Sequence, residues 1–266
     1  MSNDAVLYDV KDAIATITMN RPKAMNALNM EVAEGLSGGL KKAADDPDVR
    51  CVVITSSSAN FMAGGDLVMF KGWVDEGVEV AQERLQGAFD GAHDTVRLLK
   101  TMDKPVIASV AGGVAGYGLS LMLACDLAIA ADTTFMTLAY IKIGTSPDGG
   151  STYSLPRLVG TRKAMEIALL GDNFDAAEAE RLGLVNRVVP ADQLEAETAK
   201  LATRLANGPT RAYGRTKRLI NASHETSMND QLKAEEDAFR ACAGNKDFNE
   251  GLSSFLEKRK PDFKGE

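Results

Sequence analysis

Over about the first 190 residues, the hydrophobic pattern predicts short strands separated by helices. Residues 14–19 alternate as a half-buried strand does, and Pro22 then breaks the pattern. Short apolar runs predict buried strands at residues 51–55, 104–110, 127–130 and 135–136. Helical spacing predicts helices over residues 30–44 and 82–100, and the almost wholly apolar segment 119–125 predicts a core helix.

From residue 192 onward the pattern changes to helices alone. They are expected over residues 194–207, 211–223, 228–242 and 249–258. Repeated strand–strand–helix units followed by helices predict an α/β fold with a repeating spiral core. We place this core at residues 1–194 and a C-terminal helical region at residues 195–266. Such a region serves oligomerisation, or it packs onto its own core.

Amino-acid composition argues against several classes of protein, namely those that bind nucleic acid, bind a metal or span a membrane. The 266 residues are 45% hydrophobic and carry a net charge of −7, which argues against a nucleic-acid or anionic-membrane partner. The three cysteines have neither metal-binding nor CxxC spacing, so we expect no metal and a reducing compartment. No apolar stretch is long enough to span a membrane, and the first residues lack the features of a signal peptide. We therefore expect a cytoplasmic protein.

Two glycine-rich turns could present backbone N–H groups to an oxyanion. The first spans residues 63–66 and the second residues 112–118, directly before the apolar helix. Glycine lets the backbone approach a ligand closely, and a helix N-terminus has free N–H groups. Each turn taken alone is more simply an ordinary tight turn.

Asp148 is the carboxylate that we select as a catalytic base. It lies in a Pro-Asp-Gly-Gly turn, where the commonest role of aspartate is to cap a helix. A carboxylate with an ordinary pKa is a poor base, so apolar surroundings would have to raise it. Met136, Leu138, Tyr140 and Ile143 could supply them. His93 and His224 are expected at the surface.

In this order the motifs resemble those of the enoyl-CoA hydratase/isomerase family, the crotonase superfamily. The matching segments run almost from end to end and are residues 20–28, 61–67, 104–126, 167–185 and 255–263. The resemblance implies a ββα spiral core with a C-terminal helical trimerisation region, assembled as a homotrimer or a dimer of trimers. It also implies an acyl-CoA thioester as ligand, with no separate cofactor.

The resemblance assigns roles to individual residues. The N–H groups of Gly65 and Tyr117 would form the oxyanion hole. The substrate-binding positions, Tyr140 among them, would be Ala24, Met25, Ala63, Asp66, Leu67, Tyr140, Phe255 and Lys258. The last two would close over CoA from a neighbouring subunit, although Lys258 also fits a solvated end of a basic run.

This chain departs from the family's hydratases in an informative way. Their two glutamates fall here on Ser120 and Tyr140, whereas Asp148 stands where hydratases have glycine. That pattern resembles the Asp-dependent isomerases, such as 1,2-epoxyphenylacetyl-CoA and Δ3,Δ2-enoyl-CoA isomerases. We therefore expect an isomerase in which Asp148 alone moves a proton from C2 to C4 of a 3-enoyl-CoA.

Three alternatives stay open. A 4-halobenzoyl-CoA dehalogenase would use Asp148 as nucleophile, helped by an aromatic residue eight positions earlier, which is Tyr140. Its histidine base falls here on Arg97, one helical turn from His93, which counts against that alternative. Asp148 could also support slow enoyl-CoA hydration. Finally, the chain could bind CoA without catalysis, although the acidic pI of about 5.1 argues against an RNA-binding role.

Overall fold

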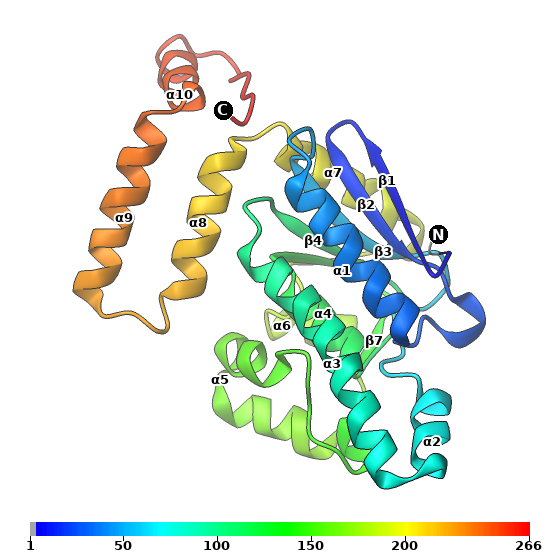
Figure 1. Cartoon of the computed structure of the whole chain (residues 1–266). Coiled ribbons are helices and arrows are strands. Elements are labelled where there is room, and N and C mark those ends of the chain that lie inside the picture. The colour runs from blue at the N-terminus through cyan, green and yellow to red at the C-terminus, as the bar shows by residue number, and fades with distance from the viewer. Residues whose placement is uncertain (1–3) are drawn as a thin grey trace.

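The computed structural model describes residues 4–266, which form a mixed sheet covered by helices and a helical arm that extends from it (Figure 1). In these residues the main sheet has six strands in the order β1-β2-β3-β4-β6-β9, with only the β1–β2 pair antiparallel. Its strands are β1 (Val6–Lys11), β2 (Ile14–Met19), β3 (Cys51–Ser56), β4 (Val106–Val110), β6 (Leu127–Ala131) and β9 (Arg187–Val189). A smaller sheet contains β5 (Gly113–Ala115), β7 (Phe135–Thr137) and β8 (Phe174–Asp175).

Strand burial follows the hydrophobic pattern. In β2, Ala15, Ile17 and Met19 are buried and alternate with half-buried residues, as the alternation predicts. Every residue of β4 is buried, because this central parallel strand is covered by helices on both faces. The hydrophobic pattern did not reveal β1, in which only the first residue is buried.

One face of the sheet is covered by α1 (Met30–Asp45), and α3 (Val78–Thr101) packs along α1 (Figure 1). The predicted stripe of Val32, Leu36 and Leu40 is fully buried, and the Asn29 side chain caps the helix. The predicted core helix is α4 (Tyr117–Ala124), and all of its residues are buried.

The sequence analysis missed α2 (Leu67–Glu76). Its sequence opens with four apolar residues in a row, Leu67–Phe70, which show no helical period, and the Asp66 side chain caps its start. The next helix, α3, begins at Val78 rather than at residue 82.

The opposite face of the sheet is covered by α7 (Leu194–Ala206). Ala202 and Ala206 pack against Cys51, Val53 and Ile107 of the strands. The predicted boundary between residues 194 and 195 falls after the first residue of this helix, and α7 packs on the sheet.

The arm consists of α8 (Thr210–Ala222), α9 (Met228–Ala243) and α10 (Lys246–Leu256), of which α9 and α10 stand away from the sheet in Figure 1. None of the residues of α9 is buried in the chain, and Met228 and Phe239 are largely exposed. No helix within residues 4–266 is long and apolar enough to cross a membrane. The remaining helices are α5 (Ser151–Leu170) and α6 (Ala176–Arg181).

Candidate active site

The two glycine turns lie against each other. A Cβ atom built on Gly64 would lie 3.5 Å from the backbone nitrogen of Tyr117 and 3.4 Å from the Cα of Gly116. Gly64 has a φ of +97°, a conformation that side chains other than hydrogen strongly disfavour. Glycine at this position therefore permits the close approach of the two turns.

The predicted oxyanion donors, Gly65 and Tyr117, flank this contact. Tyr117 is the first residue of α4, so its N–H lacks an intrahelical partner. Within residues 4–266, the structure gives neither N–H an acceptor. Both donors remain available to an oxygen placed between the turns.

Asp148 reaches this corner from a third turn. A Cβ atom built on Gly149 would lie 2.9 Å from ring atoms of Tyr117 and 2.8 Å from the Cβ of Ser120, so the turn rests on α4. The N-cap residue of α5 is Gly150, and no side chain, that of Asp148 included, caps this helix. The helix-cap interpretation of the Asp148 side chain is therefore wrong.

The two positions that hold glutamate in the family's hydratases do lie beside Asp148. Tyr140 begins a short 3-10 turn (Tyr140–Ile143), and its hydroxyl donates a short hydrogen bond to Oδ1 of Asp148. The Ser120 hydroxyl lies 3.1 Å from the Tyr140 hydroxyl and 2.9 Å from the backbone carbonyl oxygen of Asp148. One carboxylate and two neutral hydroxyl groups thus occupy the site.

Burial has the largest effect on the pKa of the Asp148 carboxyl. It raises the pKa of Asp148 above the ordinary value of 3.8, opposed by the Tyr140 hydrogen bond and by the charge of His93. The expected apolar environment is present in Met136 and Leu138, which are buried, but Ile143 is exposed. Burial also raises the pKa of both Tyr140 and Tyr117, so the two phenols stay neutral.

The predicted CoA loop lies beside the first oxyanion turn. The N–H of Ala63 donates to the carbonyl of Met25 at 3.0 Å, which joins the two segments. Ala24 and Asp66 line a surface cavity of about 670 Å³ together with basic and aromatic side chains. The rest of its lining consists of Arg21, Lys23, Val68, Met69, Gly72, Trp73, Glu76 and Arg84.

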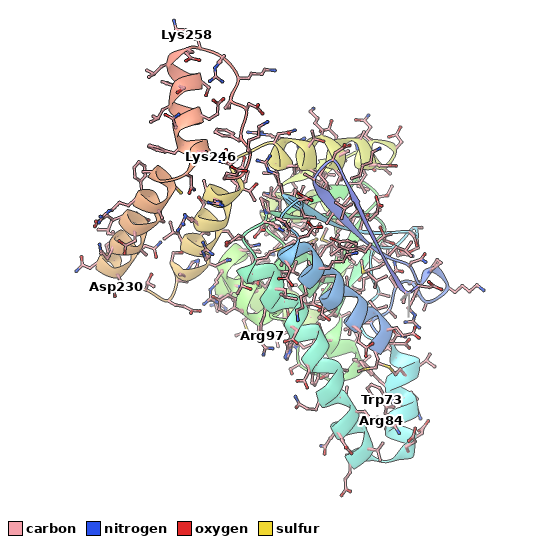
Figure 2. The ribbon with its side chains drawn as sticks, turned by 45° about the horizontal axis from the view of Figure 1, so that its top comes forward. Trp73, Arg84, Arg97, Asp230, Lys246 and Lys258 are labelled. Atoms are coloured by element: carbon pink, nitrogen blue, oxygen red, sulfur yellow. The ribbon has the colours of Figure 1, made fainter. Side chains whose placement is uncertain are left out.

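The other predicted binding residues are less well placed. The Asp66 carboxylate caps α2 and accepts a hydrogen bond from Arg21 at 3.1 Å, so it is already engaged. Leu67 is half exposed at the start of α2. Phe255 lies exposed on α10, and Figure 2 shows Lys258 at the end of the arm, far from Trp73 and Arg84. Their predicted role in a neighbouring subunit remains a prediction.

Two further residues lie near the site, Asn26 and His93, and neither was predicted to have a role there. The buried Asn26 amide donates to Ser56 and to the backbone carbonyls of Asn60 and Phe61, which ties the CoA loop to the segment before the first turn. His93 is half-buried on α3, where its ring stacks on Phe89, so it is less exposed than expected.

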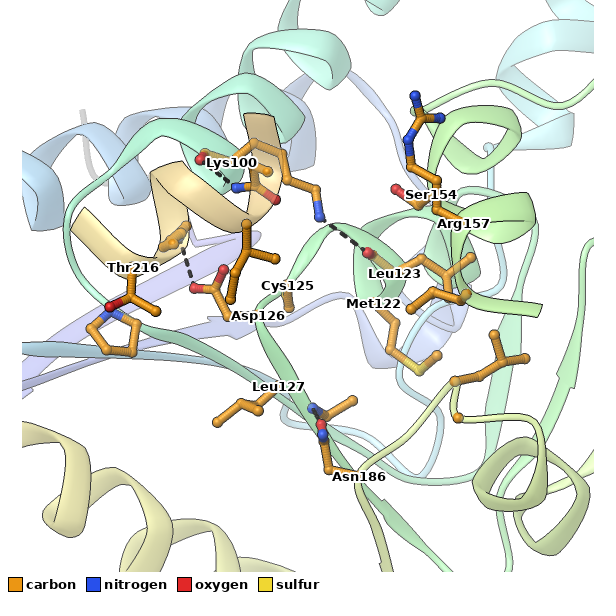
Figure 3. A pocket seen from close by; sticks show the side chains of 18 of the residues that line it. Lys100, Met122, Leu123, Cys125, Asp126, Leu127, Ser154, Arg157, Asn186 and Thr216 are labelled. Atoms are coloured by element: carbon orange, nitrogen blue, oxygen red, sulfur yellow. Dashed lines mark hydrogen bonds and ion pairs between the residues drawn. The ribbon is translucent and has the colours of Figure 1, made fainter. Parts of the chain in front are cut away.

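A separate cavity of about 480 Å³ lies between α4, α5 and α8 (Figure 3). Asp126 lies in it and pairs with Lys217 at 2.7 Å, while the Lys100 ammonium lies 3.5 Å from the carbonyl of Leu123. Burial raises the pKa of Asp126 even so. No group of histidine, cysteine or acidic side chains within residues 4–266 could hold a metal ion.

Comparison with known proteins identifies the family. A family model described as enoyl-CoA hydratase/isomerase matches residues 9–266. The chain is 36% identical over 264 residues to a protein of Mycobacterium tuberculosis named "probable enoyl-CoA hydratase", covering 99% of each. It is 35% identical to the 1,2-epoxyphenylacetyl-CoA isomerase of Escherichia coli, covering 98% of each.

Solved structures agree with the sequence matches. An enoyl-CoA hydratase from Polaromonas sp. JS666 superposes with a TM-score of 0.91 at 33% identity, covering 97% of this chain and 99% of that one. The expected crotonase-like α/β fold is therefore confirmed. The chain belongs to the enoyl-CoA hydratase/isomerase family.

Proposed function

We propose that this enzyme moves the double bond of an enoyl-CoA from the 3 to the 2 position, with Asp148 as its single acid and base. The observation that carries the proposal is the set of side chains in the site, which includes one carboxylate and two hydroxyl groups. The turn of Asp148, a carboxyl with a raised pKa, packs on the helix that begins with the donor Tyr117, while the positions of the hydratase acids hold Ser120 and Tyr140.

The geometry supports a short proton path. The thioester oxygen binds between the N–H groups of Gly65 and Tyr117. Asp148 takes the C2 proton, and the electrons of the broken C–H bond spread over a dienolate that the two donors stabilise. The protonated Asp148 then delivers its proton to C4, which leaves the double bond between C2 and C3. Tyr140 holds one oxygen of the carboxylate and leaves the other for the substrate.

An absorbance assay with a short 3-enoyl-CoA tests this function. Removing a general base costs about 10²- to 10⁴-fold, so Asp148→Asn should abolish most formation of conjugated product. Asp172→Asn, an exposed acid outside the site, is the matched control and should keep full activity. No product with the unaltered enzyme, or equal rates with Asp148→Asn, contradicts the proposal.

A specific contact favours 4-halobenzoyl-CoA dehalogenation as a second candidate. Tyr140 does bond to Asp148, as the expected aromatic partner eight positions earlier would. The Asp148 carboxylate would attack the ring carbon and expel halide. Water would then hydrolyse the aryl ester to 4-hydroxybenzoyl-CoA. Halide release from 4-chlorobenzoyl-CoA distinguishes this reaction from isomerisation.

Hydration remains the reaction named for most of the relatives, and it can be measured in the same samples. Syn-hydration needs one group to activate water and another to protonate carbon, whereas Ser120 and Tyr140 offer no second acid. We therefore expect hydration of 2-enoyl-CoA to be slower than isomerisation. CoA binding without any turnover that depends on Asp148 would identify a non-catalytic binding protein.

We also propose that CoA lies over the cavity lined by Arg21, Lys23 and Arg84. Arg21 and Arg84 pair there with Asp66 and Glu76, so a phosphate would share or replace these ion pairs. A homotrimer or dimer of trimers would bury the exposed apolar side chains of the arm, including Phe239 and Phe255. It would also bring Phe255 and Lys258 to a neighbour's CoA. Light scattering on the purified chain tests the assembly, and the mass of a monomer would contradict it.

A further inference from the structure

We propose that Ser120 is a positioning residue of this site: its hydroxyl donates to the phenol of Tyr140 and so directs the single proton of that phenol to Asp148. The inference deepens the proposed function and rests on it. Ser120 lies on α4, where the segments that carry these two partners meet.

The Ser120 side chain is enclosed by the site. Ser120 is only 1% exposed, and its hydroxyl lies 3.1 Å from the Tyr140 hydroxyl and 2.9 Å from the backbone carbonyl oxygen of Asp148. A Cβ atom built on Gly149 would lie 2.8 Å from the Cβ of Ser120, so the turn of Asp148 closes directly over this residue. One buried hydroxyl thus contacts both the 3-10 turn of Tyr140 and the turn of the base.

The number of protons fixes the direction of the contact between Ser120 and Tyr140. A phenol has one proton, and a carboxylate can only accept hydrogen bonds. Because the Tyr140 hydroxyl donates its proton to Oδ1 of Asp148, Ser120 has to be the donor at the 3.1 Å contact. Burial raises the pKa of Tyr140 and the contact with Ser120 opposes this rise, as a donor to the phenol oxygen does.

The two backbone carbonyls beside the Ser120 hydroxyl have other donors. The carbonyl of Asp148 accepts from the N–H of Ser151 at 3.2 Å and from the Ser151 hydroxyl at 2.9 Å. The carbonyl of Gly116, which lies 3.4 Å from the Ser120 hydroxyl, accepts from two N–H groups of α4. A carbonyl oxygen has two lone pairs, so neither carbonyl needs the hydroxyl proton of Ser120, which therefore goes to Tyr140.

The direction of these bonds matters for the proposed proton transfer. A hydroxyl that accepts a hydrogen bond donates more strongly, because bonds in a chain polarise one another. The Tyr140 proton therefore stays at Oδ1 of Asp148. A proton taken from C2 is then kept on the other carboxylate oxygen, from which it can return to C4. Without the Ser120 hydroxyl, the Tyr140 bond weakens and the carboxylate is held less firmly.

Steady-state isomerisation of a 3-enoyl-CoA by Ser120→Ala tests this role. The variant should fold, because both carbonyls keep other donors and alanine is the best helix former. We expect kcat to fall roughly 3- to 10-fold, as for the loss of one neutral hydrogen bond, with little change in KM. Ser109→Ala removes a buried hydroxyl that lies 2.9 Å from the Thr198 hydroxyl, between β4 and α7, and is the matched control that should keep full activity.

The double variant with Tyr140→Phe separates positioning from packing. If Ser120 acts through the phenol, Ser120→Ala has no further effect on kcat in the Tyr140→Phe background. An unchanged kcat in Ser120→Ala, a rise in KM alone, or losses that add in the double variant overturn the proposal.

A second measurement separates this inference from the proposed function. The chain contains five tyrosines, and in protein labelled with carbon-13 at tyrosine Cζ the NMR signal of Tyr140 is identified by its absence from Tyr140→Phe. This carbon reports hydrogen bonding at the phenol oxygen. Its signal should move in Ser120→Ala and stay in place in Ser109→Ala, whether or not the enzyme isomerises a 3-enoyl-CoA. A moved signal without isomerisation refutes only the isomerase function, whereas isomerisation with an unmoved signal refutes the role of Ser120.

Discussion

Asp148 and Asp126 are two partly buried acids with opposite surroundings. Asp126 lies in the cavity of Figure 3, where Lys217 contacts it at 2.7 Å and Val106 donates a backbone hydrogen bond at 2.8 Å. Asp148 has a neutral phenol as its direct side-chain partner and a histidine nearby. Burial raises the pKa of both carboxyls.

The comparison shows that burial and a cavity do not by themselves identify a catalytic acid. A permanent cation at hydrogen-bond distance neutralises Asp126 and commits it to structure. Within residues 4–266, Asp148 has no ion-pair partner at hydrogen-bond distance, so its proton affinity can serve chemistry. Four substitutions can break or sharpen this contrast.

The largest expected effect is on folding, at Asp126. Asp126→Asn leaves the Lys217 ammonium, only 8% exposed, without its counter-charge, and we expect a loss of about 3–5 kcal/mol in unfolding free energy. Chemical denaturation measures it. The double variant with Lys217→Met should recover much of that loss, because an apolar replacement leaves no buried charge. A stable single variant would show that solvent already compensates the pair.

The next largest effect is expected at Gly64, where the two predicted oxyanion turns touch. Gly64→Ala places a methyl group 3.1 Å from the backbone carbonyl oxygen of Ala115 at a strained φ of +97°, so it should push the two oxyanion turns apart. We expect kcat to fall about 10²- to 10³-fold, as for the loss of one oxyanion donor. Gly38→Ala in α1, with no atom within 4 Å of the added methyl, is the control and should keep activity.

A smaller effect on activity is expected when Asp148 loses the hydroxyl of its neutral partner, Tyr140. Tyr140→Phe deletes a hydrogen bond to a charged group, which is typically worth about 1.5–3 kcal/mol. Because this bond lowers the pKa of Asp148, its loss should move the acidic limb of kcat/KM to higher pH. Steady-state rates across pH measure both effects. An unchanged profile would show that the bond is absent in the working enzyme.

The smallest effect is a gain in stability from Asp148→Asn. A raised folded-state pKa means that ionising Asp148 destabilises the folded protein as pH rises above the ordinary value of 3.8. The asparagine variant avoids this cost, so its melting temperature should exceed that of the unaltered enzyme at neutral pH. The difference should vanish below the ordinary pKa, where both side chains are neutral. A lower melting temperature at neutral pH would contradict this sign.

Local signals predicted the elements whose pattern matches their burial. The alternating strand β2 and the apolar stripe of α1 were found because their periods match a buried face. The helix α2 was missed because its first four residues are all apolar and show no helical period. The packing of α7 on the sheet could not be separated from a free helical region, because the two have the same helical periodicity.

The sequence by itself determined the chemistry that this protein carries: two glycine turns in order, one acid at Asp148, and no acid at residues 120 and 140. Only the tertiary structure decided which side chains meet. The Tyr140 bond to Asp148 joins two turns, and the pairing of Asp126 with Lys217 joins segments 91 residues apart. Such contacts depend on strand order and helix packing, which bring together residues that no local period relates.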